Sequence, residues 1–460
     1  MASRRLENLC KHLNKSPSAS FATIVREDCI GEMENRVVDD DMETPQSEDQ
    51  NSRSNKTHSH PVFKYRYTRT PIKIVFTDTS AADERYGGSG DKAIIEGELI
   101  KADTNTKSVI IFMHPSGIQN LLPMPNAMAR AGLHVVTCTS RYPNNDSCLV
   151  MEKVVLDLGA CIRHMKEKFG YQKVLLAGWS GGGSLSSFYQ AQAESPTITH
   201  TPAGDLVDLT NANLIPGDGL LIMAAHISRA KIFTEWLDPA VLDENDPSKR
   251  DVELDLYDPN NPNVPPFSPE YVKRFREAQI ARNRRITKWA ENQLENINED
   301  YESVKVGWKQ NKRDQAFLVS CTQADIRRID TSIDPNGRSP TQLSDLAAEN
   351  HSPVGLARFT TLRSWLSQWS YDKSNADGPK SLAKITVPVM VVANEADHLV
   401  PLSHPEAMYK AVKHDRKKFH LVKGATHYYF GQNDLMASAV KEVMIWLCDQ
   451  GLLESAFLSA

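Results

Sequence analysis

The hydrophobic pattern from residue 61 onward alternates between short apolar runs and amphipathic stretches. Apolar runs typical of buried strands are SVIIFMH, HVVTCTSR, KVLLAG and GLLIMAAH, and the pattern resumes much later with VPVMVVAN and FHLVKG. Between them, residues 151–170 carry apolar side chains at helical spacing and stop at Gly170. Continuous apolar strands that alternate with helices predict an α/β fold with a mainly parallel, doubly wound sheet.

Three further strands are expected before this alternation begins. Their segments are VFKYRYTRT, IKIVFTDT and AIIEGELI, separated by polar or glycine-rich turns such as ERYGGSGDK. Their apolar and β-branched content favours extended structure.

Residues 227–384 interrupt the alternating pattern and are too many for a loop. Ser268 as N-cap and Pro269 at the first helical position predict a long helix, and ARFTTLRSWLSQWS predicts another. AFLVSC indicates a short strand or buried turn. We therefore expect a cap or lid insertion, 227–384, packed over one edge of a core made of 61–226 and 385–460.

Residues 1–60 differ in composition from the rest of the chain. They are polar and rich in Ser, Asn, Asp and Glu. Such a segment buries too little apolar surface to offset its ordering entropy, so we expect it to be disordered.

Composition and charge exclude several classes of partner. The net charge of −5 gives no electrostatic reason to bind nucleic acid or an anionic membrane. Seven cysteines without CxxC pairs indicate reduced thiols, and no stretch has the length of a membrane span. With no secretory h-region at the start, the expected location is the cytoplasm; the oligomeric state stays open.

A G-x-S-x-G sequence, Gly178 to Gly182 around Ser180, stands between a predicted strand and a predicted helix. In this context Ser180 is predicted to be a nucleophile at the tip of a sharp turn, with the helix N-terminus facing a developing oxyanion. A phosphate-binding Walker loop would need a Lys after the glycines, and a dinucleotide G-x-G-x-x-G does not fit. A purely structural glycine turn is the remaining alternative.

Candidate partners for Ser180 follow two later strands. VPVMVVAN runs into a loop with Glu395 and Asp397, and FHLVKG runs into a loop with His427. A serine nucleophile needs a base, and the base needs an orienting acid. The chain order Ser180, Asp397, His427 is that of one triad class. Asp397 is preferred over Glu395 because it lies farther past its strand.

The oxyanion of such a reaction needs two N–H donors. Gly181, the residue after the nucleophile, is expected to give one. The loop after SVIIFMH should give the other, and because Pro115 has no N–H, the choice is Ser116 first or Gly117 second. His114 is expected to brace this loop rather than act as a base.

With these motifs the chain resembles the α/β-hydrolase superfamily. MHPSG stands where that family carries its oxyanion turn, GWSGGG is similar to its nucleophile elbow, and NEADHLVP and GATHYYF match its acid and histidine loops. The resemblance implies a largely helical cap inserted after the sixth strand. Pro115 departs from the family's usual glycine, and Ser180 argues against the members that carry Asp at the elbow.

The resemblance implies a serine hydrolase of a carboxylic ester or lactone of a small metabolite, without cofactor or metal. A thioesterase, amidase, C–C hydrolase, acyltransferase or non-catalytic binding protein remain alternatives on the same fold. The cap arginines are expected to form a solvated face with internal ion pairs; they are Arg282, Arg284, Arg285, Arg327 and Arg328.

Overall fold

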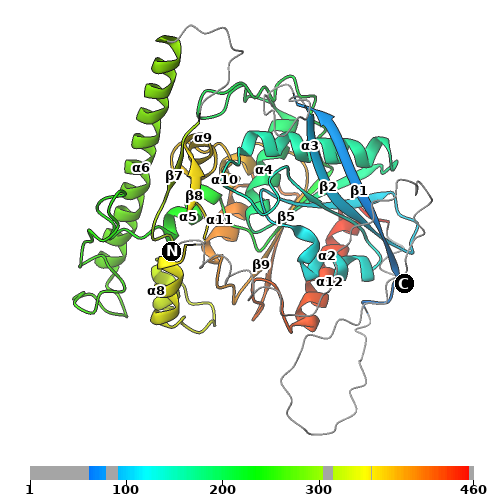
Figure 1. Ribbon diagram of the computed structural model, residues 1–460. Helices are drawn as coiled ribbons and strands as arrows, with labels where there is room; N and C mark the ends of the chain where they lie inside the picture. The colour runs from blue at the N-terminus through cyan, green and yellow to red at the C-terminus, as the bar shows by residue number, and fades with distance from the viewer. Residues whose placement is uncertain (1–61, 79–91, 304–313, 354, 455–460) are drawn as a thin grey trace, which may run out of the picture. The chain divides into compact units, whose positions relative to one another are not determined.

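The computed structural model of the protein describes residues 62–78, 92–303, 314–353 and 355–454 (Figure 1). The segment 1–60, expected to be disordered, and residues 84–91 of the expected glycine-rich turn lie outside the described residues.

An eight-stranded sheet forms the centre of the described chain. Its strands in spatial order are β1 (Tyr67–Thr77), β2 (Lys92–Ala102), β4 (His134–Thr139), β3 (Ser108–His114), β5 (Lys173–Trp179), β6 (Gly219–Met223), β9 (Val389–Asn394) and β10 (Lys417–Val422). Strand β2 runs antiparallel to both of its neighbours, and every other pairing is parallel. The predicted mainly parallel sheet is therefore confirmed.

Helices cover both faces of this sheet. The principal ones are α2 (Pro123–Arg130), α3 (Met151–Glu167), α4 (Gly181–Glu194), α11 (Ser403–Ala411) and α12 (Asn433–Asp449), with a short 3₁₀ turn η1 (Gln119–Leu121) after β3. Helices α2 and α12 lie side by side (Figure 1).

Alternate residues of each central strand belong to two separate hydrophobic cores. In β3, Val109 and Ile111 pack in the core that holds side chains of α3, α4 and α11, whereas Ile110 and Phe112 pack in the core of α2 and α12. Successive strand side chains point to opposite faces, so a strand buried on both faces must be apolar throughout. This explains the continuous apolar runs in the sequence.

The expected strands VFKYRYTRT and IKIVFTDT are one strand rather than two. Strand β1 continues through Pro71, which lies opposite Glu98 of β2. Because β1 is at the edge of the sheet, the missing N–H of Pro71 costs no ladder bond on its outer side.

The chain between β6 and β9, which are neighbours in the sheet, contains the segment 227–384, called here the insertion. Its elements are α5 (Arg229–Trp236), α6 (Pro269–Ser303), β7 (Ala316–Leu318), α7 (Ile326–Ile329), α8 (Leu343–His351), β8 (Phe359–Thr361), α9 (Leu362–Ser364), the π-helix η2 (Trp365–Trp369) and α10 (Gly378–Leu382). Strands β7 and β8 pair antiparallel. The division of the chain into core and cap domains stays a prediction.

The long helix of the insertion begins as its sequence indicates. Pro269 is the first residue of α6, and the Tyr271 N–H donates to Ser268 Oγ at 3.2 Å. The second expected helix, 357–370, is wrong in its first part. Phe359 pairs with Leu318 across the β7–β8 ladder, and the helical turns of α9 and η2 start only at Leu362.

No helix in the described ranges is both long enough and apolar enough to cross a membrane.

A glycine of α4 gives a test of how tightly this helix packs on the sheet. An ideal Cβ on Gly183 would overlap the Ala225 Cβ, which belongs to the chain just after β6. We expect Gly183→Ala to lower the free energy of unfolding by about 1–3 kcal/mol, measured by denaturant titration.

Gly159 of α3 is the matched control. Its added Cβ would meet the end of the flexible Leu214 side chain at 2.9 Å. Alanine is the better helix former by about 1 kcal/mol, so Gly159→Ala should leave the free energy of unfolding unchanged or raised. Equal losses in the two variants would contradict the packing argument.

Candidate active site

Ser180 lies at the junction of β5 and α4 in a strained backbone conformation. Its φ is 52° and its ψ −118°, a combination that non-glycine residues rarely adopt. Its N–H donates to the Met223 carbonyl at 3.1 Å, and its side chain is half-buried. The strain is held by this bond and by close packing, and it places the hydroxyl at the tip of the turn.

Two glycines permit that packing. A Cβ on Gly178 would overlap the backbone of Gly182, and one on Gly182 would lie 2.6 Å from the Met113 carbonyl oxygen. Any larger residue would push α4 away from the ends of β3 and β5. The turn around Ser180 can therefore close only with glycine at both positions.

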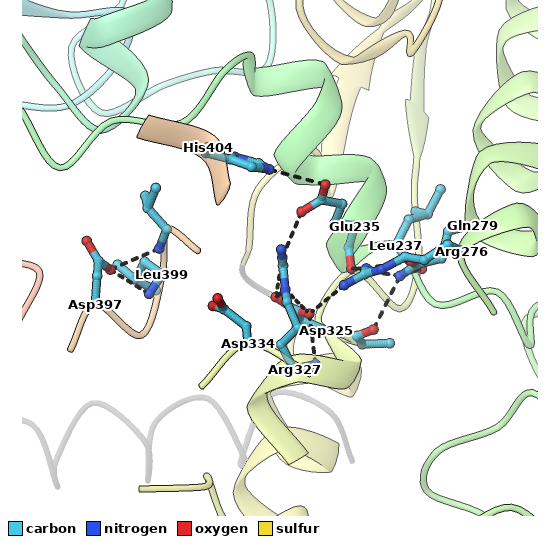
Figure 2. A network of polar contacts seen from close by, with 12 residues as sticks. Glu235, Leu237, Arg276, Gln279, Asp325, Arg327, Asp334, Asp397, Leu399 and His404 are labelled. Atoms are coloured by element: carbon cyan, nitrogen blue, oxygen red, sulfur yellow. Dashed lines mark hydrogen bonds and ion pairs between the residues drawn. The ribbon is translucent and has the colours of Figure 1, made fainter. Parts of the chain in front are cut away.

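His427 and Asp397 form a buried pair on the loops that follow β10 and β9. His427 Nδ1 and Asp397 Oδ2 are 2.6 Å apart, and the two residues are 0% and 1% exposed. Asp397 Oδ1 accepts the N–H groups of Leu399 and Val400 at 2.8 and 2.9 Å, of which the first is visible in Figure 2. Because both carboxylate oxygens are engaged, the acid can hold the imidazole in one orientation.

Glu395, the alternative acid, does not contact His427. Its Oε2 accepts the Gly424 N–H at 3.0 Å and so holds the turn at the end of β10. Asn394 at the end of β9 braces the histidine loop, since its Nδ2 donates to the Thr426 carbonyl at 2.8 Å and its Oδ1 accepts from Tyr429 Oη at 2.6 Å. The sequence analysis missed this brace, whose signal was a polar residue at a strand's carboxyl end.

The remaining nitrogen of His427 is buried and free. Because Nδ1–H donates to Asp397, Nε2 is the acceptor nitrogen of the neutral ring, and it has no hydrogen-bond partner among the described residues. The ring contacts Trp179, the residue before Ser180, edge-on at 6.1 Å between centroids. No hydrogen bond joins Ser180 Oγ to Nε2; such bonds are often loose before substrate binds.

His114, at the end of β3, closes the loop that follows it. Its Nδ1 accepts the N–H groups of both Ser116, at 3.1 Å, and Gly117, at 2.7 Å. A nitrogen that accepts two such bonds carries no proton, so the ring proton is on Nε2. Burial, and then the neighbouring Arg229 and His427, lower the pKa of His114 to about 3, so the ring is neutral at physiological pH.

These hydrogen bonds occupy the two N–H groups that were expected as second oxyanion donors. The N–H groups of Ser116 and Gly117 point at the imidazole of His114, which performs the bracing expected of it. His114 Nε2 lies on the other side of the ring, 2.6 Å from where a Cβ of Gly181 would be. The Nε2–H of His114 therefore lies beside Gly181, the residue expected to give the first oxyanion donor.

Arg229, the first residue of α5, lies at the same place and was not found from the sequence. It is 4% exposed, and its Nη1 lies 3.4 Å from the Cβ position of Gly181. Its Nε donates to Gln368 Oε1 at 3.1 Å, and the guanidinium stacks on Trp369, 4.4 Å from the ring centroid. Burial lowers the pKa of Arg229 to about 10, against the opposing effect of Asp146. A single Arg without a motif carries no sequence signal.

A network of charged side chains ties the insertion to α11 (Figure 2). Glu235 of α5 pairs with His404 at 3.2 Å and with Arg327 at 2.7 Å, and Arg327 also pairs with Asp325 at 2.7 Å. Burial raises the pKa of Glu235, but His404 and Arg327 together hold it far below its usual range. Nearby, Arg338 Nη1 donates to the Asp397 carbonyl at 3.0 Å, so the insertion also contacts the acid loop.

The insertion arginines singled out in the sequence are all ion-paired. Their partners are Glu244 for Arg282 and Arg285, Asp372 for Arg284, Asp325 and Glu235 for Arg327, and Glu349 for Arg328. The expected internal ion pairs are present, although Arg282 and Arg327 are buried rather than solvated. In the part of the chain that the structure describes, no group of three or more His, Cys, Asp or Glu residues has the geometry of a metal site.

Comparison with known proteins gives structural likeness at low sequence identity. No protein-family model and no curated protein sequence matches the chain. The α/β-hydrolase GrgF from Penicillium sp. sh18 has a TM-score of 0.43 and 9% identity, covering 83% of this chain and 99% of its own. Est1E from Butyrivibrio proteoclasticus has a TM-score of 0.40 and 12% identity, covering 83% and 98%.

The esterase domain of a Rhodothermus marinus protein has a TM-score of 0.37 and 10% identity, covering 82% of this chain and 98% of its own. We draw nothing about substrate from likeness at this level. The fold assignment rests on the chain's own topology, a mainly parallel sheet with Ser180 on a strand–turn–helix elbow and Asp397 and His427 after later strands. By this arrangement the chain has the architecture of the α/β-hydrolase fold.

Proposed function

We propose that this chain is a serine hydrolase that cleaves a carboxylic ester or lactone of a small organic metabolite through an acyl-enzyme at Ser180. The observation that carries the proposal is the buried Asp397–His427 pair: its Nε2 has no hydrogen-bond partner among the described residues, and its ring contacts Trp179, the residue before Ser180. A buried base nitrogen without a partner is costly in a purely structural role. Thioester, amide, C–C bond and acyl-transfer chemistry use the same groups and remain alternatives.

In the proposed reaction, Ser180 Oγ attacks the substrate carbonyl carbon while His427 Nε2 takes the hydroxyl proton. The imidazolium is stabilised by Asp397 and returns the proton to the leaving oxygen, which gives the acyl-enzyme. His427 then takes a proton from water as the water attacks the acyl carbon; the bond from this carbon to Ser180 Oγ breaks, the imidazolium returns the proton to Oγ, and the carboxylic acid is released.

The oxyanion needs donors that are fixed before the reaction starts. Gly181 N–H at the start of α4 is one. In place of Ser116, we propose that the second is His114 Nε2–H, because the Ser116 N–H is engaged by Nδ1 of the same ring. A neutral imidazole can act as such a donor when its proton position is fixed, as it is here by two accepted bonds.

The first prediction from this proposal concerns the nucleophile. Wild-type protein should react covalently with a fluorophosphonate probe and hydrolyse a p-nitrophenyl ester, whereas Ser180→Ala should do neither while keeping its circular dichroism spectrum. Mass spectrometry should place the adduct on Ser180. Unlabelled and inactive wild-type protein would favour a non-catalytic binding protein, whereas a fully active Ser180→Ala variant would show that Ser180 is not the nucleophile.

The second prediction separates the two acidic residues after β9. Asp397→Asn should lower kcat by about 10⁴-fold, because the amide no longer orients and stabilises the imidazolium. Glu395→Gln is the matched control and should change kcat by less than about threefold, since Glu395 contacts a backbone N–H rather than His427. Steady-state kinetics on one ester decide the assignment, and the reverse ranking would transfer the acid role to Glu395.

The third prediction concerns the second oxyanion donor. His114→Phe removes the Nε2–H and should lower kcat by about 10²–10³-fold with little change in KM. His114→Gln keeps an N–H donor on a shorter side chain and should recover part of that loss.

Ser116→Pro is the companion variant, since it removes the Ser116 N–H but leaves the Gly117 bond to His114. It should cost much less than His114→Phe. A loss in Ser116→Pro as large as that in His114→Phe would return the donor role to the Ser116 backbone.

A further inference from the structure

We propose that Arg229 forms an anion subsite beside Ser180, and that the substrate is an ester carrying a carboxylate close to its scissile carbonyl. The inference rests on the proposed hydrolase function and names the substrate class of that same site.

The position of the guanidinium places it at the reacting centre. Gly181 follows the nucleophile, and the place where its Cβ would be lies 3.4 Å from Arg229 Nη1 and 2.6 Å from His114 Nε2. A side chain at this position would collide with the imidazole, so glycine lets both the His114 ring and the guanidinium approach the residue after the nucleophile. In the proposal, an anion bound by Nη1 lies beside the carbonyl that Ser180 attacks.

The guanidinium keeps unused hydrogen-bonding capacity despite its burial. Nε is bonded to Gln368, but Nη2 is buried and has no hydrogen bond among the described residues. Its ion pair is with Asp146, whose Oδ2 is 3.5 Å from Nη2 and is itself buried without a hydrogen bond. Buried donors of a charged group are costly to leave unpaired, and a carboxylate matches the planar fork of an arginine.

The surrounding groups favour an anion. His226 has a buried Nδ1 without a partner in the described chain, and its pKa is lowered well below the usual range by burial and then by His404, Arg229, His114 and His427. The pKa values of His114 and His226 are both lowered, and Asp146 is the carboxylate that opposes the charge of Arg229. The catalytic carboxylate of Asp397 is engaged by His427 and two backbone N–H groups.

A structural role alone does not account for this arrangement. The bond from Nε to Gln368 and the stacking on Trp369 already join Arg229 to the η2 segment of the insertion. Neither uses Nη1, the nitrogen that lies against Gly181. The five arginines singled out from the sequence are ion-paired within the insertion, whereas the carboxylate beside Arg229 is Asp146, outside the insertion and 3.5 Å from Nη2.

The test uses alkylboronic acids, which form reversible tetrahedral adducts with a nucleophilic serine. The boronic acids have chains of two, three or four carbons. At each length, one compound carries a terminal carboxylate and its partner carries the isosteric carboxamide. Their inhibition constants are measured as protection of the full-length protein from fluorophosphonate labelling. In wild-type protein at least one carboxylate should bind about 10- to 100-fold more tightly than its amide.

For each variant, the ratio of the inhibition constants of the carboxylate and the carboxamide is measured in one preparation. A general loss of activity affects both constants equally and leaves the ratio unchanged. Arg229→Gln should bring the carboxylate-to-amide preference close to one. Asp146→Asn removes the opposing charge and should increase the carboxylate-to-amide preference. Arg284→Gln, at an exposed arginine paired with Asp372, is the control and should leave the ratio unchanged.

The possible failures are distinguishable. Absence of fluorophosphonate labelling contradicts the hydrolase itself. Normal labelling with equal protection by acid and amide, or with no protection by any of the acids, overturns the anion subsite and leaves the hydrolase intact. If Arg229→Gln does not fold, a ratio that fails to rise in Asp146→Asn overturns the proposal.

Discussion

Close approach of backbone segments at Ser180 is the constraint on which the site depends. Gly178 lies against the backbone of Gly182, Gly182 against the Met113 carbonyl at the end of β3, and Gly183 against Ala225 after β6. The carboxyl ends of three parallel strands can therefore meet at one hydroxyl. The first residues of α4 are glycines and carry no side chain. Ser180, the loop at His114 and the start of α5 at Arg229 can therefore pack against one another.

Electrostatic coupling between His114 and Arg229 joins the proposed oxyanion donor to the proposed anion subsite. The positive charge of Arg229 adds to burial in holding the imidazole neutral, and the two backbone N–H groups then determine which nitrogen keeps the proton. A protonated ring could not accept those bonds. The cation that would bind an anionic substrate thus also helps to keep the neighbouring donor ring neutral.

The sequence predicted most of the sheet because a strand buried on both faces must be apolar throughout, as β3 is. Ser180, Asp397 and His427 were predicted because each follows such a run. Local sequence patterns did not predict three other features, which depend on contacts between distant parts of the chain. Strand β1 continues through Pro71 because its outer edge is unpaired, β8 is extended because of its partner Leu318, and Arg229 acquires its place only through tertiary contacts.

The insertion contacts the acid loop through one set of bonds and holds the guanidinium of Arg229 through another. Arg338 reaches the backbone of the acid loop at Asp397, whereas Gln368 and Trp369 hold the guanidinium of Arg229. Between these contacts, Glu235, Arg327 and Asp325 form buried ion pairs, whose desolvation cost offsets much of their attraction. Such pairs contribute little net stability but require a defined geometry. Because all three residues belong to the insertion, their clearest physical effect here is to hold α5 and α7 of the insertion in one arrangement, which the pair of Glu235 with His404 then joins to α11 of the core.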